Sequence, residues 1–136
     1  MLKQLPHEGK VTEALELVEE LEEMSKSDKL NKIFSYGIIL LLHLIKQSAE
    51  NRSTKSWEIS IFNAVKQIQR TNQPHQVKET YLTEEEIAET LQDAYELALR
   101  KASVEAFEGR YEVDEIAQMV DEKNILENAL HLMSQE

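Results

Sequence analysis

The residues best suited to metal chemistry in this sequence are glutamates spaced three apart. Glu16 and Glu19 form one such pair, and Glu20 and Glu23 form another. On a helix this spacing places both carboxylates of a pair on one face, and such oxygen ligands suit a hard cation such as Mg²⁺. The two pairs are therefore candidate magnesium ligands, although the same spacing is common on any acidic helix.

The enzyme that this pattern would fit is a magnesium-dependent nucleotide pyrophosphohydrolase. All-helical enzymes of that class hold the metal with carboxylates on two helices, at Glu-x-x-Glu and Glu-x-x-Asp spacing. The second half is imperfect here, because Glu86 and Glu89 are three apart but Glu89 and Asp93 are four apart. Cysteine and His-Glu-x-x-His are absent, and the three glycines are too scattered for a phosphate loop. We expect no cofactor and lean away from an enzyme.

Charge is unevenly distributed along this acidic chain, whose net charge is −11. Residues 46–78 carry six Lys/Arg against two Asp/Glu, a net +4, whereas residues 79–136 carry four against sixteen, a net −12. A strongly negative total argues against non-specific binding to nucleic acid or anionic membranes, because long-range repulsion dominates. The basic segment 46–78 leaves one further alternative, a nucleic-acid-associated protein.

The stretch Leu30–Ser48 must position the other elements. Its centre, Ile38–Ile45, is apolar everywhere except at His43. A helix with one wet face repeats polar residues every three or four positions, so this helix is predicted to be covered on nearly all sides. The apolar run is too short for a bilayer, which takes about 20 residues. Gly37, in mid-helix, is expected where another backbone approaches closely.

Apolar residues at helical spacing predict further helices around this one. They are expected over Val11–Met24, from about Trp57 to the polar run before Pro74, from Thr83 to about Phe107, and over Asp114–Met133 as one helix or two with a break at 121–124. The sequence therefore predicts an all-α single domain over 1–136, a bundle of about five helices around a buried central helix. Residues 1–10 are expected to be a flexible N-terminus, and 109–136 a C-terminal helical extension.

Capping residues mark several helix ends. Thr83 and Glu86 have the spacing of a capping box, and Gly109 is a natural helix stop. The cap of the central helix is expected at Ser27 or Asp28. For the next helix the candidate caps are Ser53, Thr54 and Ser56.

Two of the predicted helices have outward faces of opposite charge. The outward face of Val11–Met24 is acidic and consists of Glu13, Glu16, Glu19, Glu20, Glu22 and Glu23. A face of this kind is solvated, or it meets a basic partner or a divalent metal. The helix near Trp57 should bury Trp57, Ile61, Ala64, Val65 and Ile68, with Phe62 beside them. Its outward residues are Lys55, Asn63, Lys66, Gln67 and Arg70.

Several short stretches resemble domain of unknown function family 29, a bacterial family abundant in cyanobacteria. They are Leu17–Met24, Leu41–Lys46, Arg52-Ser53, Ser56-Trp57 followed by Ile59 and Ile61, and Ala94-Tyr95 with Ala98. The resemblance covers about two-thirds of the chain. It implies an all-helical bacterial protein whose activity is not established.

The resemblance selects six polar and aromatic residues around the corner that follows the central helix. They are His43, Lys46, Arg52, Ser56, Trp57 and Tyr95. In a structural corner, Arg52 would cap the last carbonyls of the central helix or pair with a carboxylate of the predicted helix Val11–Met24, and His43 would bond to Tyr95 or Glu20. In a functional corner, Lys46, Arg52 and Lys55 would bind an anion or phosphate group near a helix start.

The first functional expectation is a non-enzymatic helical interaction module that binds a protein partner or itself. The missing catalytic motifs and the strongly amphipathic helices support it. The stretch Met1–Lys10 has no apolar run of signal-peptide length, and the lack of cysteine suits a reducing compartment. We therefore expect a cytoplasmic protein without a membrane segment.

Overall fold

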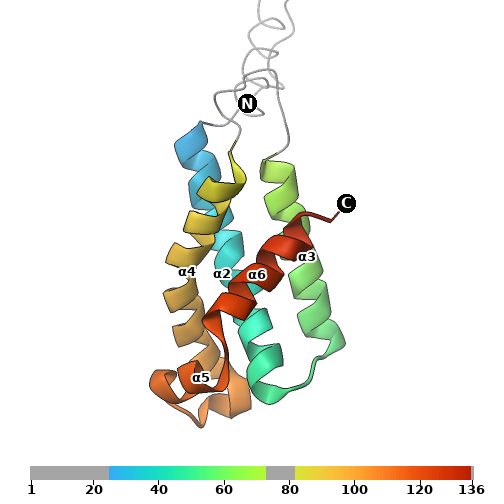
Figure 1. Cartoon of the computed structure of the whole chain (residues 1–136). Helices are drawn as coiled ribbons and strands as arrows, with labels where there is room; N and C mark the ends of the chain where they lie inside the picture. The colour runs from blue at the N-terminus through green and yellow to red at the C-terminus, as the bar shows by residue number, and fades with distance from the viewer. Residues whose placement is uncertain (1–24, 73–81, 136) are drawn as a thin grey trace, which may run out of the picture.

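The computed structural model describes residues 25–72 and 82–135, and every regular element in these ranges is a helix (Figure 1). The elements are α2 (Lys26–Glu50), α3 (Lys55–Thr71), α4 (Glu84–Glu105), the 3-10 helix η3 (Ala106–Gly109), α5 (Val113–Met119) and α6 (Glu122–Met133). The predicted all-α fold class is confirmed. In these ranges no helix combines the length and hydropathy needed to cross a bilayer. The predicted helix Val11–Met24 and the expected flexible N-terminus lie outside the described residues.

Helix α2 is the centre of the bundle. It packs against α3 and α4, and α6 crosses in front of it and contacts all three (Figure 1). Leu40, Leu41 and Ile45 are completely buried, as the apolar run predicted. Ile39 is 38% exposed, so the neighbouring helices leave one side of α2 partly open to solvent. The prediction of a buried central helix is therefore confirmed for its apolar centre.

Helices α2 and α4 run in the same direction. Near the start of both, Lys26 Nζ lies 2.9 Å from Glu86 Oε2. Near their other ends, Lys46 Nζ lies 2.8 Å from Glu105 Oε1. Because α2 and α3 are joined by the short loop 51–54 and run in opposite directions, α4 must start again from the end where α2 begins (Figure 1).

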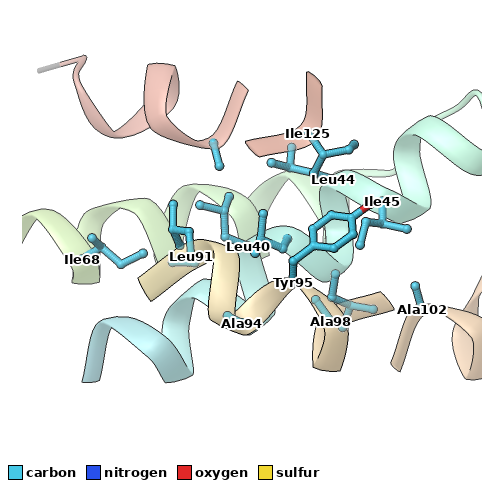
Figure 2. Packing of buried hydrophobic residues seen from close by; sticks show 14 of the residues in the cluster. Leu40, Leu44, Ile45, Ile68, Leu91, Ala94, Tyr95, Ala98, Ala102 and Ile125 are labelled. Carbon is cyan, nitrogen blue, oxygen red and sulfur yellow. The ribbon is translucent and has the colours of Figure 1, made fainter. Parts of the chain in front are cut away.

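Small residues allow α2 and α4 to approach closely. Gly37 of α2 is buried, and so are Ala94, Ala98 and Ala102 of α4 (Figure 2). A Cβ added at position 37 would lie 2.8 Å from Leu91 Cδ2, which is closer than carbon atoms pack. At Gly37 the close neighbours are therefore side-chain atoms rather than the backbone that the sequence predicted, and Leu91 occupies the space that a larger side chain would need.

Two helix starts differ in detail from the sequence prediction. Ser25 caps α2 by accepting the Asp28 N–H at 3.1 Å, so the expected cap at Ser27 or Asp28 is wrong and the helix begins earlier. Thr54 caps α3 by accepting the Trp57 N–H at 3.1 Å. It is one of the three candidates, and α3 therefore begins at Lys55, two residues before the expected start.

The ends of α4 and the start of α6 are set by capping residues and by a left-handed turn. The capping box of Thr83 and Glu86 is present at the start of α4. That helix ends at Glu105 rather than at Phe107, because the chain then turns into a left-handed conformation. The last segment is two helices, and Asp121 caps α6 by accepting backbone N–H groups of its first turn. The break therefore consists of Val120 and Asp121, and only Asp121 lies within the expected range 121–124.

Replacing Gly37 with leucine should lower the free energy of unfolding by about 1–3 kcal/mol, the usual cost of overpacking a core. The added atoms must displace Leu91 from a site where it is completely buried. Chemical denaturation of the purified variant would measure the change. Ser35→Leu, at an exposed position of the same helix, is the control and should change little. Additive effects of Gly37→Leu and Leu91→Ala in the double variant would contradict the contact.

Candidate functional site

Three of the six selected residues meet at the corner between α2 and α3. Lys46 Nζ lies 4.6 Å from the centroid of the Trp57 ring, and the guanidinium carbon of Arg52 lies 4.8 Å from it. Both distances are within the range of cation–π attraction. Trp57 is therefore held by two cations, one from near the end of α2 and one from the loop that follows it.

Each of these cations also has a carboxylate partner. Lys46 Nζ lies 2.8 Å from Glu105 Oε1, and Arg52 Nε lies 2.8 Å from Glu50 Oε1. The Lys46 side chain is only 8% exposed, so its pairing offsets the cost of removing a charge from water. Sequence reasoning missed Glu50 and Glu105, and only the position of Glu50, two residues before Arg52, could have suggested a pair.

An open pocket of about 460 Å³ lies at this corner. It is lined by Lys46, Glu50, Arg52, Trp57, Glu105, Phe107, Glu108 and Arg110. The three cations are matched by three carboxylates, so the lining has no net positive charge to attract an anion. Lys55, the third cation of the anticipated phosphate site, is not part of the lining. The charge balance supports the structural interpretation of the corner over an anion site.

A left-handed turn closes one side of the pocket. Phe107, Glu108 and Gly109 all have positive φ, at 52°, 59° and 79°. A left-handed residue other than glycine costs of order 1 kcal/mol, so two of them in succession need support. Glu50 supplies it, because its Oε2 accepts the Phe107 N–H at 2.9 Å. The Phe107 ring also packs edge-on against Tyr111, with centroids 5.0 Å apart.

The hydrogen bond to Phe107 also sets the acidity of Glu50. It lowers the pKa of this carboxyl below its ordinary value of 4.5. Burial opposes the shift, and the hydrogen bond and charge of Arg52 add to it. The ionised form is therefore the one that holds the turn, as expected for a carboxylate that accepts a backbone N–H.

The other three selected residues do not join this cluster. Ser56 is exposed and Tyr95 is buried in the core, where Figure 2 shows its ring among Leu40, Leu44 and Ile45. Burial and the charges of Glu122 and Asp121 raise the pKa of Tyr95 to about 12. The phenol is thus neutral at ordinary pH, and its ring belongs to the α2–α4 packing.

His43 is half-buried beside the cluster. Its Nδ1 is shielded from water and has no hydrogen-bond partner within the described part of the chain. The anticipated bond to Tyr95 is therefore not formed, and Glu20, the other partner considered, lies outside that part. Burial lowers the pKa of His43, nearby Lys46 lowers it further, and Glu105 opposes both. We infer a neutral imidazole.

A second hollow, the α3–α6 groove, is more apolar. It has a volume of about 390 Å³ and lies where α2, α3 and α6 meet. Its apolar lining comes from Leu44, Ile61, Phe62, Val65 and Leu132, and its charged lining residues are Lys66 and Glu58. An apolar hollow of this kind can receive side chains from another helix.

The outer face of α3 next to the groove exposes unusual residues. Ile59 is 66% exposed and Phe62 is 64% exposed, although Phe62 was expected beside the buried row. Lys55, Lys66 and Arg70 are exposed on the same helix, as predicted, and Lys66 Nζ lies 5.5 Å from the Phe62 ring centroid. We name these five residues the α3 face. It combines large apolar side chains with positive charge in a chain that is otherwise acidic.

The described part of the chain gives the magnesium hypothesis no support. Glu16, Glu19, Glu20 and Glu23 lie outside the described residues. Among the described ones, no group of three or more His, Asp or Glu could hold a metal. Glu86, from the second half of the pattern, accepts the Thr83 N–H and pairs with Lys26, and both interactions lower its pKa.

Comparison with known protein families finds a match that covers most of the chain. The family model described as domain of unknown function DUF29 matches residues 7–125. No curated protein and no solved structure matches the chain.

Replacing Glu50 with glutamine should lower the free energy of unfolding at pH 7 by about 1–2 kcal/mol, because a charge-assisted hydrogen bond is lost. Since the folded state lowers the pKa of Glu50, its contribution is present above about pH 4.5 and is lost as the pH falls below it. The variant should therefore show a shallower loss of stability between pH 7 and pH 3 in thermal melts. The exposed Glu108→Gln is the control, and identical pH profiles for both variants would contradict the role of Glu50.

Proposed function

The chain belongs to the family described as domain of unknown function DUF29, and we propose that it is a non-enzymatic helical module that binds an acidic amphipathic helix of a protein. The binding surface is the α3–α6 groove together with the α3 face. As expected from the sequence, we place this module in the cytoplasm. The observation that carries the proposal is the exposure of Ile59 and Phe62 beside an apolar groove.

The exposed apolar side chains of α3 would supply the driving force for binding a partner helix. Burying a side chain of the size of phenylalanine or isoleucine is worth about 1.5–3 kcal/mol. Ile59 and Phe62 are three positions apart on α3, so they lie on one side of the helix. A partner helix with apolar residues three and four apart could cover both and place another side chain in the groove.

Charge sets the chemistry of the partner. The α3 face carries Lys55, Lys66 and Arg70 around its apolar centre, and Glu58 is the single exposed carboxylate of α3. An acidic helix would pair with these cations at the rim of the interface, which favours the correct partner and speeds its encounter. A basic helix would meet repulsion there. The binding should therefore weaken at high salt.

The two alternatives receive less support. A nucleotide pyrophosphohydrolase needs a metal site, and Glu86 is already engaged by the helix cap and by Lys26. A nucleic acid could use the three exposed cations of α3, but it would leave Ile59 and Phe62 without an apolar partner. The strongly acidic remainder of the chain would also repel it.

A photo-crosslinking residue in place of Phe62 tests the proposal in the full chain. We would insert p-benzoylphenylalanine there and illuminate it with a designed amphipathic peptide whose polar positions are all glutamate. The matched control peptide has lysine at those positions. Mass spectrometry should find adducts to the acidic peptide, or to an acidic amphipathic helix of the chain itself, and none to the basic peptide.

Salt and position provide further controls. Raising the salt from about 0.1 M to about 1 M shortens the Debye length from about 10 Å to about 3 Å and should reduce the adducts. The same crosslinker at Val104, which is 71% exposed on α4, should give none. Equal labelling by both peptides, or no adduct to any acidic helix, would refute the proposed function.

A further inference from the structure

We infer that the occupant of the α3–α6 groove is the segment Val11–Met24 of a second copy of this chain, so that two copies exchange these segments. The inference rests on the proposed function, because it names the acidic helix that the groove receives. Three observations support it: the charge of the segment, its apolar pattern and the place where it joins α2.

The segment has the charge that the α3 face requires. Residues 11–24 contain six glutamates and no lysine or arginine. The α3 face exposes three cations around two apolar side chains. The α3 face of a second copy would instead bring cations against cations. Charge therefore favours contact between this segment and α3 over contact between two α3 helices.

The segment also has the apolar pattern of a helix that docks in a groove. Leu17, Val18, Leu21 and Met24 fall at spacings of three and four, which places them along one stripe. The six glutamates lie at other positions of the segment, together with Val11, Thr12, Ala14 and Leu15. Such a stripe could cover Phe62 and insert into the groove, while the glutamates at its edges face the exposed cations of α3.

The position of the segment in the chain points to a second copy. Helix α2 begins at Lys26, and the groove lies beside Leu44, about 27 Å further along at about 1.5 Å per residue. A helix folded back from Met24 along α2 would place Val18 only about 9 Å along, and even Val11 about 20 Å along. The stripe Leu17–Met24 thus ends about 17 Å short of Leu44 in its own copy, whereas the segment of another copy can approach this end of the groove from outside.

Reciprocal exchange gives a closed assembly. Each copy offers one segment and one groove, so a two-fold dimer uses both pairs and leaves no open end. This distinguishes exchange from head-to-tail contact, which would continue into a chain of copies. The predicted product is therefore a dimer of defined size whose two interfaces are identical.

Sedimentation velocity of the full chain over a range of concentrations tests the exchange. The unaltered chain should be a dimer that weakens from about 0.1 M to about 1 M salt. Phe62→Asp, in the groove, and Val18→Asp, in the segment, should each raise the dimer dissociation constant by at least about 100-fold, since each places a charge in both interfaces. Val104→Asp is the control on α4 and should change the constant by less than about 3-fold.

Mixing the two defective variants separates exchange from simple damage to the fold. The Phe62→Asp copy retains a sound segment, and the Val18→Asp copy retains a sound groove. Their mixture should therefore form heterodimers through one intact interface, although each variant alone is monomeric. A loss of folding in either variant would not be rescued by mixing, and circular dichroism would reveal it directly.

A monomeric unaltered chain, a dimer indifferent to Phe62→Asp, or a mixture without heterodimers would overturn the exchange. The photo-crosslinking result then separates the two proposals. If the crosslinker at position 62 still labels an acidic peptide, the groove binds such helices and its natural occupant is another protein. If it labels no acidic helix, the proposed function fails as well.

Discussion

The close approach of α2 and α4 is the constraint on which the rest of the fold depends. It is possible because Gly37 has no side chain and because the facing positions of α4 are largely alanine. Leu91 of α4 then fills the space beside Gly37, and α3 and α6 also pack against α2. Since α2 is buried at its centre, each neighbouring helix is fixed by the face of α2 that it covers.

The corner at the far end of α2 shows how the fold accommodates charge. A lysine that is almost completely buried is placed between a tryptophan ring and a carboxylate, and the adjacent arginine is matched in the same way. The strained turn after α4 is held by a carboxylate from α2. These interactions connect the last turn of α2 to the end of α4 and to the start of α3. The pocket that they surround has balanced charge, which is why the functional argument rests on the α3 face instead.

Much of this architecture could be predicted from periodicity and capping. The apolar run of α2 and the capping box at Thr83 each depend on near neighbours in sequence, and each is confirmed. The candidate site was harder to predict, because its decisive partners lie far apart in the chain. Lys46 meets Glu105 across 59 positions, and no spacing rule links them. Tyr95 was selected by resemblance, but the three-dimensional packing places it in the core instead.

The exposure of Phe62 could not be predicted from the spacing of apolar residues in α3 either. A helical wheel places this residue next to the buried row of α3, and only the position of α6 decides whether that edge is covered. In the structure α6 reaches the groove but leaves the phenylalanine largely open. Sequence periodicity thus identifies which residues are apolar, whereas the packing of a distant helix determines which of them remain available to a partner.

The parallel course of α2 and α4 has a consequence for the order in which the chain folds. The hairpin of α2 and α3 closes through the four-residue loop 51–54, whereas the pairing of α2 with α4 joins residues about 60 apart. Loop-closure entropy makes the second event costlier by about 2 kcal/mol. On a ribosome, moreover, α4 emerges only after both of its predecessors. The apolar stripe of α2 that α4 finally covers therefore stays open throughout that interval, and nascent chains are most prone to aggregate before Leu91, Ala94 and Ala98 have been synthesised.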